Sequence, residues 1–240
     1  VITAAAFVPS TPLLVPEAAS GAAYELGDVR AAAQQALADA LATSPRRVVV
    51  LGASSRVIGT PVPHGIATHA AGTGSLRGFG VAVDVPLDPA TPSAQPLSLA
   101  STLGAWLLAR AGWPGERLAV ELDPESDDAA LDARGASLAD GVPTVLLVVA
   151  DGSASRTEKA PASLHPEAEA FDAIAAKALG SGDPGALAAL DRDLASAVTS
   201  AGRPAWRTAA AALQGSAYAA ELLADEAPYG VGYLVARWTR

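Results

Sequence analysis

A short apolar run at residues 145–150 constrains the fold of this chain more than any other stretch. The run is partly β-branched and is typical of a strand buried on both faces of an α/β sheet. A polar loop beginning at Asp151 follows it, and a helix-periodic segment opens at His165. The loop carries the candidate ligand-binding residues Asp151, Ser153, Ser155 and Arg156. Ligand sites of open α/β sheets lie at the carboxyl ends of strands, although an ordinary strand-to-helix connection has the same pattern.

The rest of the chain alternates short apolar runs with helix-periodic segments, which predicts an α/β fold with a central, mostly parallel sheet flanked by helices. We expect strands at 2–8, 47–51 and 117–122, a closing pair at 217–223 and 229–238, and helices at 26–41, 97–111, 129–138 and 205–213. Another helix is predicted to start after the N-cap Asp183 and to include Leu194. The Gly- and Pro-rich stretch 57–96 is typical of a functional loop. Without an internal repeat or a linker, residues 1–240 are interpreted as one domain.

Composition limits the classes of partner. The formal net charge is −9 and no basic stripe is present, which argues against nucleic acid or an anionic membrane as the main partner. The absence of cysteine removes disulfides, thiolate metal sites and cysteine nucleophiles from consideration. No apolar stretch approaches the roughly 20 residues that span a bilayer, and the first residues lack the basic region of a signal peptide. We expect a cytoplasmic protein.

Histidines and serines are the remaining candidates for direct chemistry. His64 and His69 are five residues apart, so on a strand they would face opposite sides, and they are only a weak alternative for a metal site. His165 fits a structural role better than that of a ligand. The nucleophile motif G-x-S-x-G is missing, and Ser54, Ser55, Ser153 and Ser155 are interpreted as turn and cap residues.

Five segments, in their order along the chain, carry a family resemblance. They are FVPSTPLLVPE, RRVVVLGASSR, VVADGSASRTEKAPASLHPEAEAFD, GDPGALAALDRDLASAVTSAGRP and PYGVGYLVARW. Together they resemble the class III extradiol ring-cleavage dioxygenases, the group of the protocatechuate 4,5-dioxygenase catalytic subunit, and the related Memo-like proteins. The resemblance implies an α/β core of the phosphorylase/hydrolase-like type with a pocket at strand ends. In active members that pocket holds a non-haem Fe(II) that binds a catechol-type substrate and oxygen.

The chain differs from these families at the positions where they carry metal ligands and an acid–base histidine. Ser10 and Thr11 stand where active members carry a histidine ligand between prolines, and Ser54-Ser55 replaces a serine-histidine pair. Ala154-Ser155-Arg156 lacks the histidine of Leu-Ser-His-Arg, and Ala201-Gly202-Arg203 replaces the Cys-Gly-Arg of the Memo-like branch. Hydroxyl and methyl groups cannot substitute for imidazole or thiolate on a divalent transition metal.

Three functions are compatible with these departures. The first is a dioxygenase-like protein without a catalytic metal or other cofactor, which binds a small molecule in the family's pocket or acts as a partner subunit. The second is an extradiol dioxygenase whose Fe(II) ligands have moved, recruiting His64, His69 or His165. The third is a metal-free enzyme that uses Ser54, Ser55, Ser153 or Asp151 with Arg156. A homo-oligomer is compatible with each of them.

The charge of the pocket predicts the class of its ligand. If Arg156 and Arg203 both line it, Asp151 alone would oppose two guanidiniums, and the pocket would accept an anionic ligand in place of a metal-bound aromatic one. The alternative is that each arginine is held by a structural carboxylate such as Glu158 or Asp191.

Overall fold

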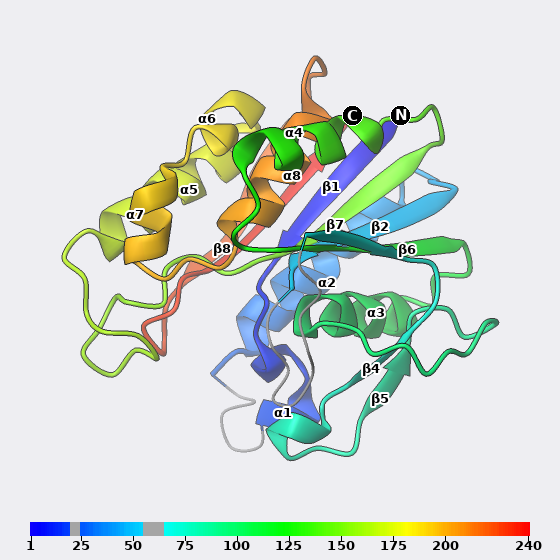
Figure 1. Cartoon of the computed structure of the whole chain (residues 1–240), viewed down its shortest axis with the longest axis horizontal. Helices are drawn as coiled ribbons and strands as arrows, with labels where there is room; N and C mark the ends of the chain where they lie inside the picture. The colour runs from blue at the N-terminus through cyan, green and yellow to red at the C-terminus, as the bar shows by residue number, and fades with distance from the viewer. Residues whose placement is uncertain (20–24, 55–64) are drawn as a thin grey trace.

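The protein is described from a computed structural model, for residues 1–19, 25–54 and 65–240. A seven-stranded sheet runs through the molecule in the order β3-β6-β2-β7-β1-β9-β8 (Figure 1). Its strands are β1 (Ile2–Val8), β2 (Arg47–Ala53), β3 (Ile66–His69), β6 (Glu116–Leu122), β7 (Thr144–Val149), β8 (Ala219–Glu226) and β9 (Tyr233–Thr239). The central strands β6, β2, β7 and β1 are parallel, whereas β3 and the β8–β9 pair join antiparallel at the two edges.

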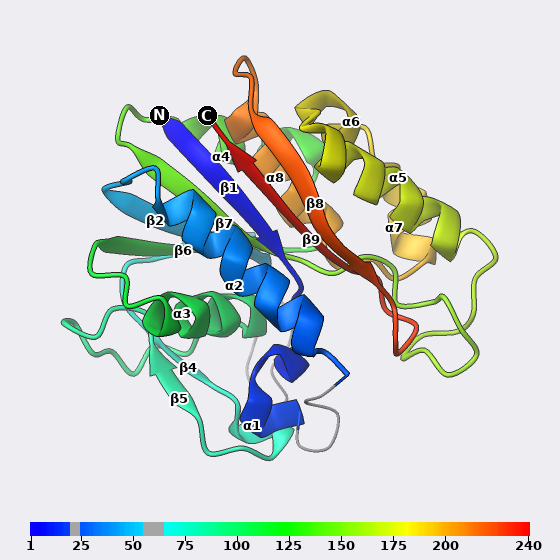
Figure 2. The same cartoon turned by 180° about the vertical axis from the view of Figure 1, so that it is seen from behind.

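Helices cover both faces of this sheet, as Figures 1 and 2 show from opposite sides. One face carries α1 (Pro16–Ala19), α2 (Gly27–Leu41) and α3 (Leu99–Arg110). The other carries α4 (Asp128–Ser137), α5 (Ala168–Ser181), α6 (Pro184–Ala188), α7 (Arg192–Ala197) and α8 (Arg203–Leu213). The 3-10 helices η1 (Pro12–Leu14) and η3 (Arg77–Phe79) and the two-stranded sheet of β4 (Thr73–Ser75) and β5 (Asp84–Pro86) complete the elements.

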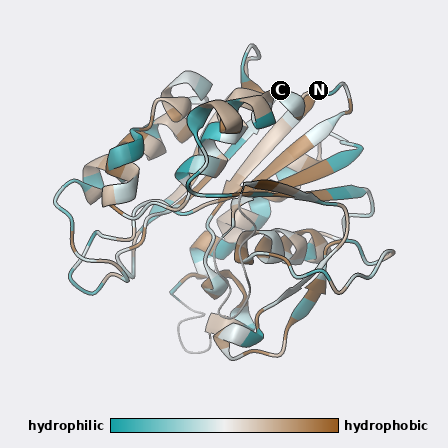
Figure 3. Cartoon of the chain, viewed as in Figure 1, coloured by the Kyte–Doolittle hydropathy of each residue, from teal (hydrophilic) through white to brown (hydrophobic). Residues whose placement is uncertain are grey.

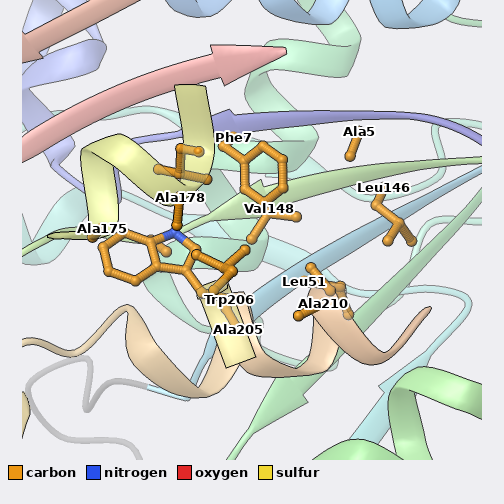
Figure 4. Close-up of a cluster of buried hydrophobic side chains, with 14 of the residues drawn as sticks. Ala5, Phe7, Leu51, Leu146, Val148, Ala175, Ala178, Ala205, Trp206 and Ala210 are labelled. Carbon is orange, nitrogen blue, oxygen red and sulfur yellow. The ribbon is translucent and has the colours of Figure 1, made fainter. Parts of the chain in front are cut away.

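Alternation along the strands divides the buried side chains into two cores. In β1, Phe7 packs toward the face of α5 and α8, while Val8 packs toward the face of α2 and α3. Figure 4 shows Phe7 and Val148 beside Trp206 of α8, and Trp206 is only 1% exposed. In Figure 3, hydrophobic colour runs along much of the central strands, and hydrophilic colour lies on parts of α4 and α7.

The sheet confirms the expected α/β architecture with a central, mostly parallel sheet flanked by helices. β2 and β7 pair in parallel, from Arg47 opposite Thr144 to Gly52 opposite Val149. Their carboxyl ends therefore lie at the same edge of the sheet. Among the described residues, no helix is long and apolar enough to cross a membrane.

The helix predicted to continue from Asp183 to Leu194 is corrected by the structure, which contains two short helices there. Asp183 is the N-cap of α6, as expected, and its Oδ1 accepts a hydrogen bond from the backbone N–H of Ala186 (3.0 Å). A second N-cap, Asp191, accepts a hydrogen bond from the backbone N–H of Leu194 (2.7 Å) and starts α7 in a new direction. An aspartate side chain competes with the helix for backbone donors, so the chain ends one helix and begins another at this point.

Candidate functional site

The carboxyl edge of the parallel strands brings together most of the candidate residues. Ser10 and Thr11 follow β1, Ser54 follows β2, and Asp151 follows β7. Ser55 and His64 lie outside the described residues. Because β1, β2 and β7 are parallel, their exits share one edge, and this edge is where the site is built.

Asp151 is the centre of the site. Its Oδ1 accepts a hydrogen bond of 2.7 Å from the backbone N–H of Ser10, which joins the exits of β1 and β7. No hydrogen bond to its Oδ2 is made within the described residues, and Asp151 is partly exposed. Burial raises the pKa of this carboxyl to about 7, the Ser10 N–H opposes the rise, and the charge of Asp172 adds to it. Asp151 therefore offers one unpaired oxygen and a proton that exchanges near neutral pH.

Two hydroxyl groups lie on the α2 and α3 side of Asp151. The Tyr233 hydroxyl donates a long hydrogen bond of 3.4 Å to Thr11 Oγ1, and both side chains are buried. Burial raises the pKa of Tyr233, the hydrogen bond with Thr11 lowers it, and the charge of Asp151 raises it further. Sequence reasoning identified Thr11 but missed Tyr233, which belongs to β9 and reaches the site through the pairing of β9 with β1.

The segment before α8 also meets Asp151. A Cβ added to Gly202 would lie 2.2 Å from the backbone oxygen of Asp151, so only glycine permits this approach. The Ser200 hydroxyl donates to that same oxygen at 3.4 Å. The segment that contains Ser10 and the segment that contains Ala201 therefore both contact Asp151. In both segments the chain resembles the families but lacks their metal ligands.

Asp172 of α5 is a second buried carboxylate, and it organises the loop after β7. The backbone N–H and the hydroxyl of Ser153 both donate to it, each at 2.7 Å. A Cβ on Gly152 or Gly232 would lie within 2.5 Å of its oxygens. Burial raises the pKa of Asp172, while the Ser153 hydrogen bonds and Arg156 oppose the rise. Ser153 is therefore committed to holding Asp172 rather than free to act as a nucleophile.

Other candidates on this loop are also engaged in structural contacts. The Ser155 hydroxyl donates to the backbone oxygen of Val198 (3.1 Å), and the backbone N–H of His165 donates to the oxygen of Ser155 (2.9 Å). His165 Nδ1 accepts a hydrogen bond from the backbone N–H of Glu167 (3.3 Å) at the start of α5. Ser155 and His165 thus position the loop.

Of the two alternatives for Arg156 and Arg203, the structure shows the one in which structural carboxylates hold each arginine. Arg203 is buried, and its two terminal nitrogens donate to the two carboxylate oxygens of Asp128 at 2.8 and 2.9 Å. Arg156 lies 3.7 Å from Asp172 and 3.6 Å from Glu169. Structural carboxylates hold both arginines, although they are not the Glu158 or Asp191 that the sequence offered. Among the described residues at this edge, Arg156 and Arg203 are therefore offset by carboxylates.

The described donors at this edge do not suit the Fe(II) of the resembled family. Around Asp151 the donors are the hydroxyls of Thr11 and Tyr233, and hydroxyls are poor ligands for ferrous ion compared with imidazole. The Ser54 N–H and hydroxyl both donate hydrogen bonds to the backbone oxygen of Leu122 (2.7 and 3.0 Å). Within residues 1–19, 25–54 and 65–240, no group of three or more His, Cys, Asp or Glu side chains could hold a metal ion.

His69, the weak metal alternative, lies away from the strand exits. It pairs with Ala119 in the β3–β6 ladder, whereas Ile66 pairs with Leu122 at the end of β6. Its buried Nε2 lies 3.6 Å from Glu121 Oε2 and has no hydrogen-bond partner in the part of the chain that the structure describes. Glu121 already has a structural partner, because its Oε1 accepts a hydrogen bond from the backbone N–H of Ser98 at the start of α3 (2.7 Å).

Comparison with known proteins supports the fold. No family model and no curated protein matches the chain. The structure is similar to that of the uncharacterized protein JW3007 from Escherichia coli K12, with a TM-score of 0.50 and 14% sequence identity. The alignment covers 99% of this chain and 100% of that one. At this identity the similarity establishes a shared fold and carries no activity across.

Proposed function

We propose that this chain is a dioxygenase-like protein that binds a small molecule at the carboxyl edge of its sheet without a transition metal. The resembled families place their pocket at this edge, and the positions of their ligands here carry Ser10, Thr11, Ser54-Ser55 and Ala201. The donor set supports a hydrogen-bonding site rather than a coordination site. A protein can keep its scaffold while the chemistry of its site changes.

The observation that carries this proposal is the unpaired Oδ2 of Asp151. One oxygen of the carboxyl is fixed by Ser10, which orients the group, while the other has no hydrogen bond from the described residues. A ligand hydroxyl or amine would satisfy it, and Tyr233 and Thr11 add hydroxyls beside it. With Arg156 and Arg203 offset by carboxylates, a neutral or amino-bearing ligand suits this edge better than an anionic one. Phenols and catechols, the aromatic class of the resembled family, have the required hydroxyl.

A metal-free acid–base enzyme is the second candidate, and the pKa of Asp151 favours it. A general acid or base works best when its pKa is near the operating pH, and burial raises that of Asp151 to about 7. The partner group would be Tyr233 rather than Arg156, because Tyr233 is the residue whose pKa responds to the charge of Asp151.

A ligand panel tests the proposal. Thermal shifts would be measured with phenol, catechol, an aromatic amine, a non-aromatic diol and benzoate, on the wild type, Asp151→Asn and the control Asp28→Asn. Asp28 is exposed at the start of α2, so the control makes the same chemical change away from the site. Stabilisation of the wild type and the control by a hydroxyl- or amino-bearing compound, with loss in Asp151→Asn, is expected. Equal shifts in all three proteins, or a response to benzoate alone, would contradict the proposed site.

Metal content is measured on the same preparations. Protein purified without added metal is expected to contain far less than one equivalent of iron, zinc or copper by plasma emission. Near-stoichiometric metal that persists through dialysis would overturn the metal-free part of the proposal and restore the relocated-ligand dioxygenase.

A further inference from the structure

A groove of about 400 Å³ lies between α2 and α3. Figure 2 shows these two helices next to each other on one face of the sheet. Their second halves line the groove, and these halves lead back to the amino ends of β2 and β6. The groove is therefore at the opposite end of the sheet from Asp151, which follows the carboxyl end of β7. Its volume is within the usual range of small-molecule sites.

Aliphatic side chains form most of the groove. On α2 the lining residues have the i, i+3, i+4 and i+7 spacing of one helix face, and they are Gln34, Leu37, Ala38 and Leu41. On α3 the lining residues are Leu107, Arg110 and the C-cap residue Ala111. Leu37 and Leu107 are buried and form the floor. Ala38 and Ala111 are exposed, and their short side chains leave the space between the helices open. Among the described residues, no aromatic side chain lines the groove.

Two polar side chains line the groove, Gln34 from α2 and Arg110 from α3, and neither has a hydrogen-bond partner in the described parts of the chain. The guanidinium of Arg110 lies over Trp106, 5.1 Å from the centroid of its ring. No described carboxylate lies within 4.0 Å of this guanidinium, and no described aspartate or glutamate lines the groove.

The charge of Arg110 also acts on Arg30, which lies nearer the start of α2. Burial lowers the pKa of Arg30, the charge of Arg110 lowers it further, and the carboxylate of Glu17 opposes the change. Glu17 belongs to α1 and is not among the lining residues of the groove. Arg110 therefore gives the groove a positive charge that no carboxylate of its lining offsets.

An apolar groove with one positive charge fits a ligand that has a hydrocarbon body and one carboxylate. A hydrocarbon alone would leave Arg110 and Gln34 without a partner, and an inorganic anion would leave the leucine side chains in contact with water. We propose that the groove binds the anion of a free, medium-chain alkyl carboxylic acid, with its carboxylate at Arg110 and Gln34 and its chain against the three leucines. The contact with Trp106 restrains the guanidinium before binding, which lowers the entropy cost of the ion pair. This inference does not depend on the ligand proposed at Asp151.

The test is a titration with acetate, butanoate, hexanoate and octanoate at neutral pH and constant ionic strength. Binding is followed by the NMR signals of the Ala111 amide and of the Trp106 indole N–H. Saturable shifts are expected with octanoate, and each added CH₂ group should tighten binding by up to about fourfold, because it buries further apolar surface. The neutral alcohol 1-hexanol should bind about tenfold more weakly than hexanoate, because it lacks the charge-assisted hydrogen bond to Arg110.

Matched variants separate the charge from the space. Arg110→Gln should bind octanoate about tenfold more weakly, whereas Arg192→Gln, at an exposed position of α7, should bind it normally. Ala38→Leu should block the groove, whereas Ala31→Leu, at an exposed position of α2 outside the groove, should not. Asp151→Asn should bind octanoate as the wild type does. Non-saturating shifts, equal affinity for acetate and octanoate, equal affinity within either pair of variants, or loss of binding in Asp151→Asn would overturn the inference.

Discussion

The carboxyl of Asp151 and the backbone N–H of Ser10, 141 residues apart in the sequence, are joined by a hydrogen bond of 2.7 Å. The bond links the exits of β7 and β1, which pair in parallel up to Val8 and Val149. It orients one oxygen of Asp151 and leaves the other available. Several consequences of this arrangement can be measured.

Stability should fall as the pH rises from about 4 to about 7. The pKa of Asp151 is raised from 3.8 to about 7 in the folded state, so in this window the folded protein holds a proton that the unfolded chain has released. The loss cannot exceed about 1.4 kcal/mol per pH unit for one group. Urea unfolding of Asp151→Asn should show a shallower pH dependence. Some slope should persist, because burial also raises the pKa of Asp172. An identical slope in both proteins would mean that Asp151 titrates normally.

Gly202→Ala should destabilise the protein by about 1–3 kcal/mol, the usual cost of overpacking. The new Cβ would lie 2.2 Å from the backbone oxygen of Asp151, while the φ of −80° at Gly202 is itself acceptable for alanine. The control is Gly27→Ala, where nothing lies within 4 Å of the added Cβ. Chemical denaturation should show a lower midpoint for Gly202→Ala only. Equal midpoints for the two variants would disprove the close approach of α8 to the β7 exit.

Ser153→Ala should cost about 1–3 kcal/mol, because it removes one of two hydrogen bonds from a buried carboxylate. Asp172 would keep the Ser153 N–H but lose the hydroxyl at 2.7 Å. Ser137→Ala, at an exposed hydroxyl near the end of α4, is the control and should be nearly neutral. Unfolding free energies from urea titrations provide the comparison. A nucleophilic role for Ser153 would instead be indicated by unchanged stability together with loss of a measured activity.

Asp128→Asn should destabilise the packing of α4 on α8, because Arg203 is buried and would lose its charged partner. Asp128 is itself partly exposed, so a cost of about 1–3 kcal/mol is expected rather than that of a fully buried pair. The pKa of Asp128 is lowered by Arg203, so its stabilisation is present above pH 3.8 and is lost as the pH falls through the folded value. Unfolding at pH 6 and pH 3 should therefore show a smaller difference between variant and wild type at the lower pH.

Local sequence patterns predicted the sheet well, because short apolar runs and helical periodicity are properties of neighbouring residues. The run at 145–150 became β7 (Thr144–Val149), and β2 and β6 also lie at their expected positions. The break between α6 and α7 was missed because the apolar spacing of Leu187, Leu190 and Leu194 continues across it, while Asp191 caps the second helix. The sequence did contain a signal for this break, because Asp191 stands three residues before Leu194 in the position of an N-cap.

The site was predictable only in part. Ser10, Thr11, Ser54 and Asp151 share an edge because parallel strands must end together, and this follows from the sequence. The partners of Arg156 and Arg203 could not be predicted from the sequence. Asp128 reaches Arg203 from another helix 75 residues away, and Asp172 reaches Ser153 by the packing of α5. Such pairings depend on tertiary packing, for which neighbouring residues in the sequence provide no signal.

The central claim, that Asp151 is an oriented and ligandable carboxyl, is tested most directly by NMR of aspartate labelled with ¹³C at Cγ. The wild-type spectrum is predicted to contain a resonance that titrates near pH 7 and is missing in Asp151→Asn. Addition of a hydroxyl- or amino-bearing ligand found in the panel should lower the pKa of that resonance, because a donor at Oδ2 favours the charged form. If the Asp151 resonance titrated near pH 4 and did not respond to any compound, the account would be contradicted.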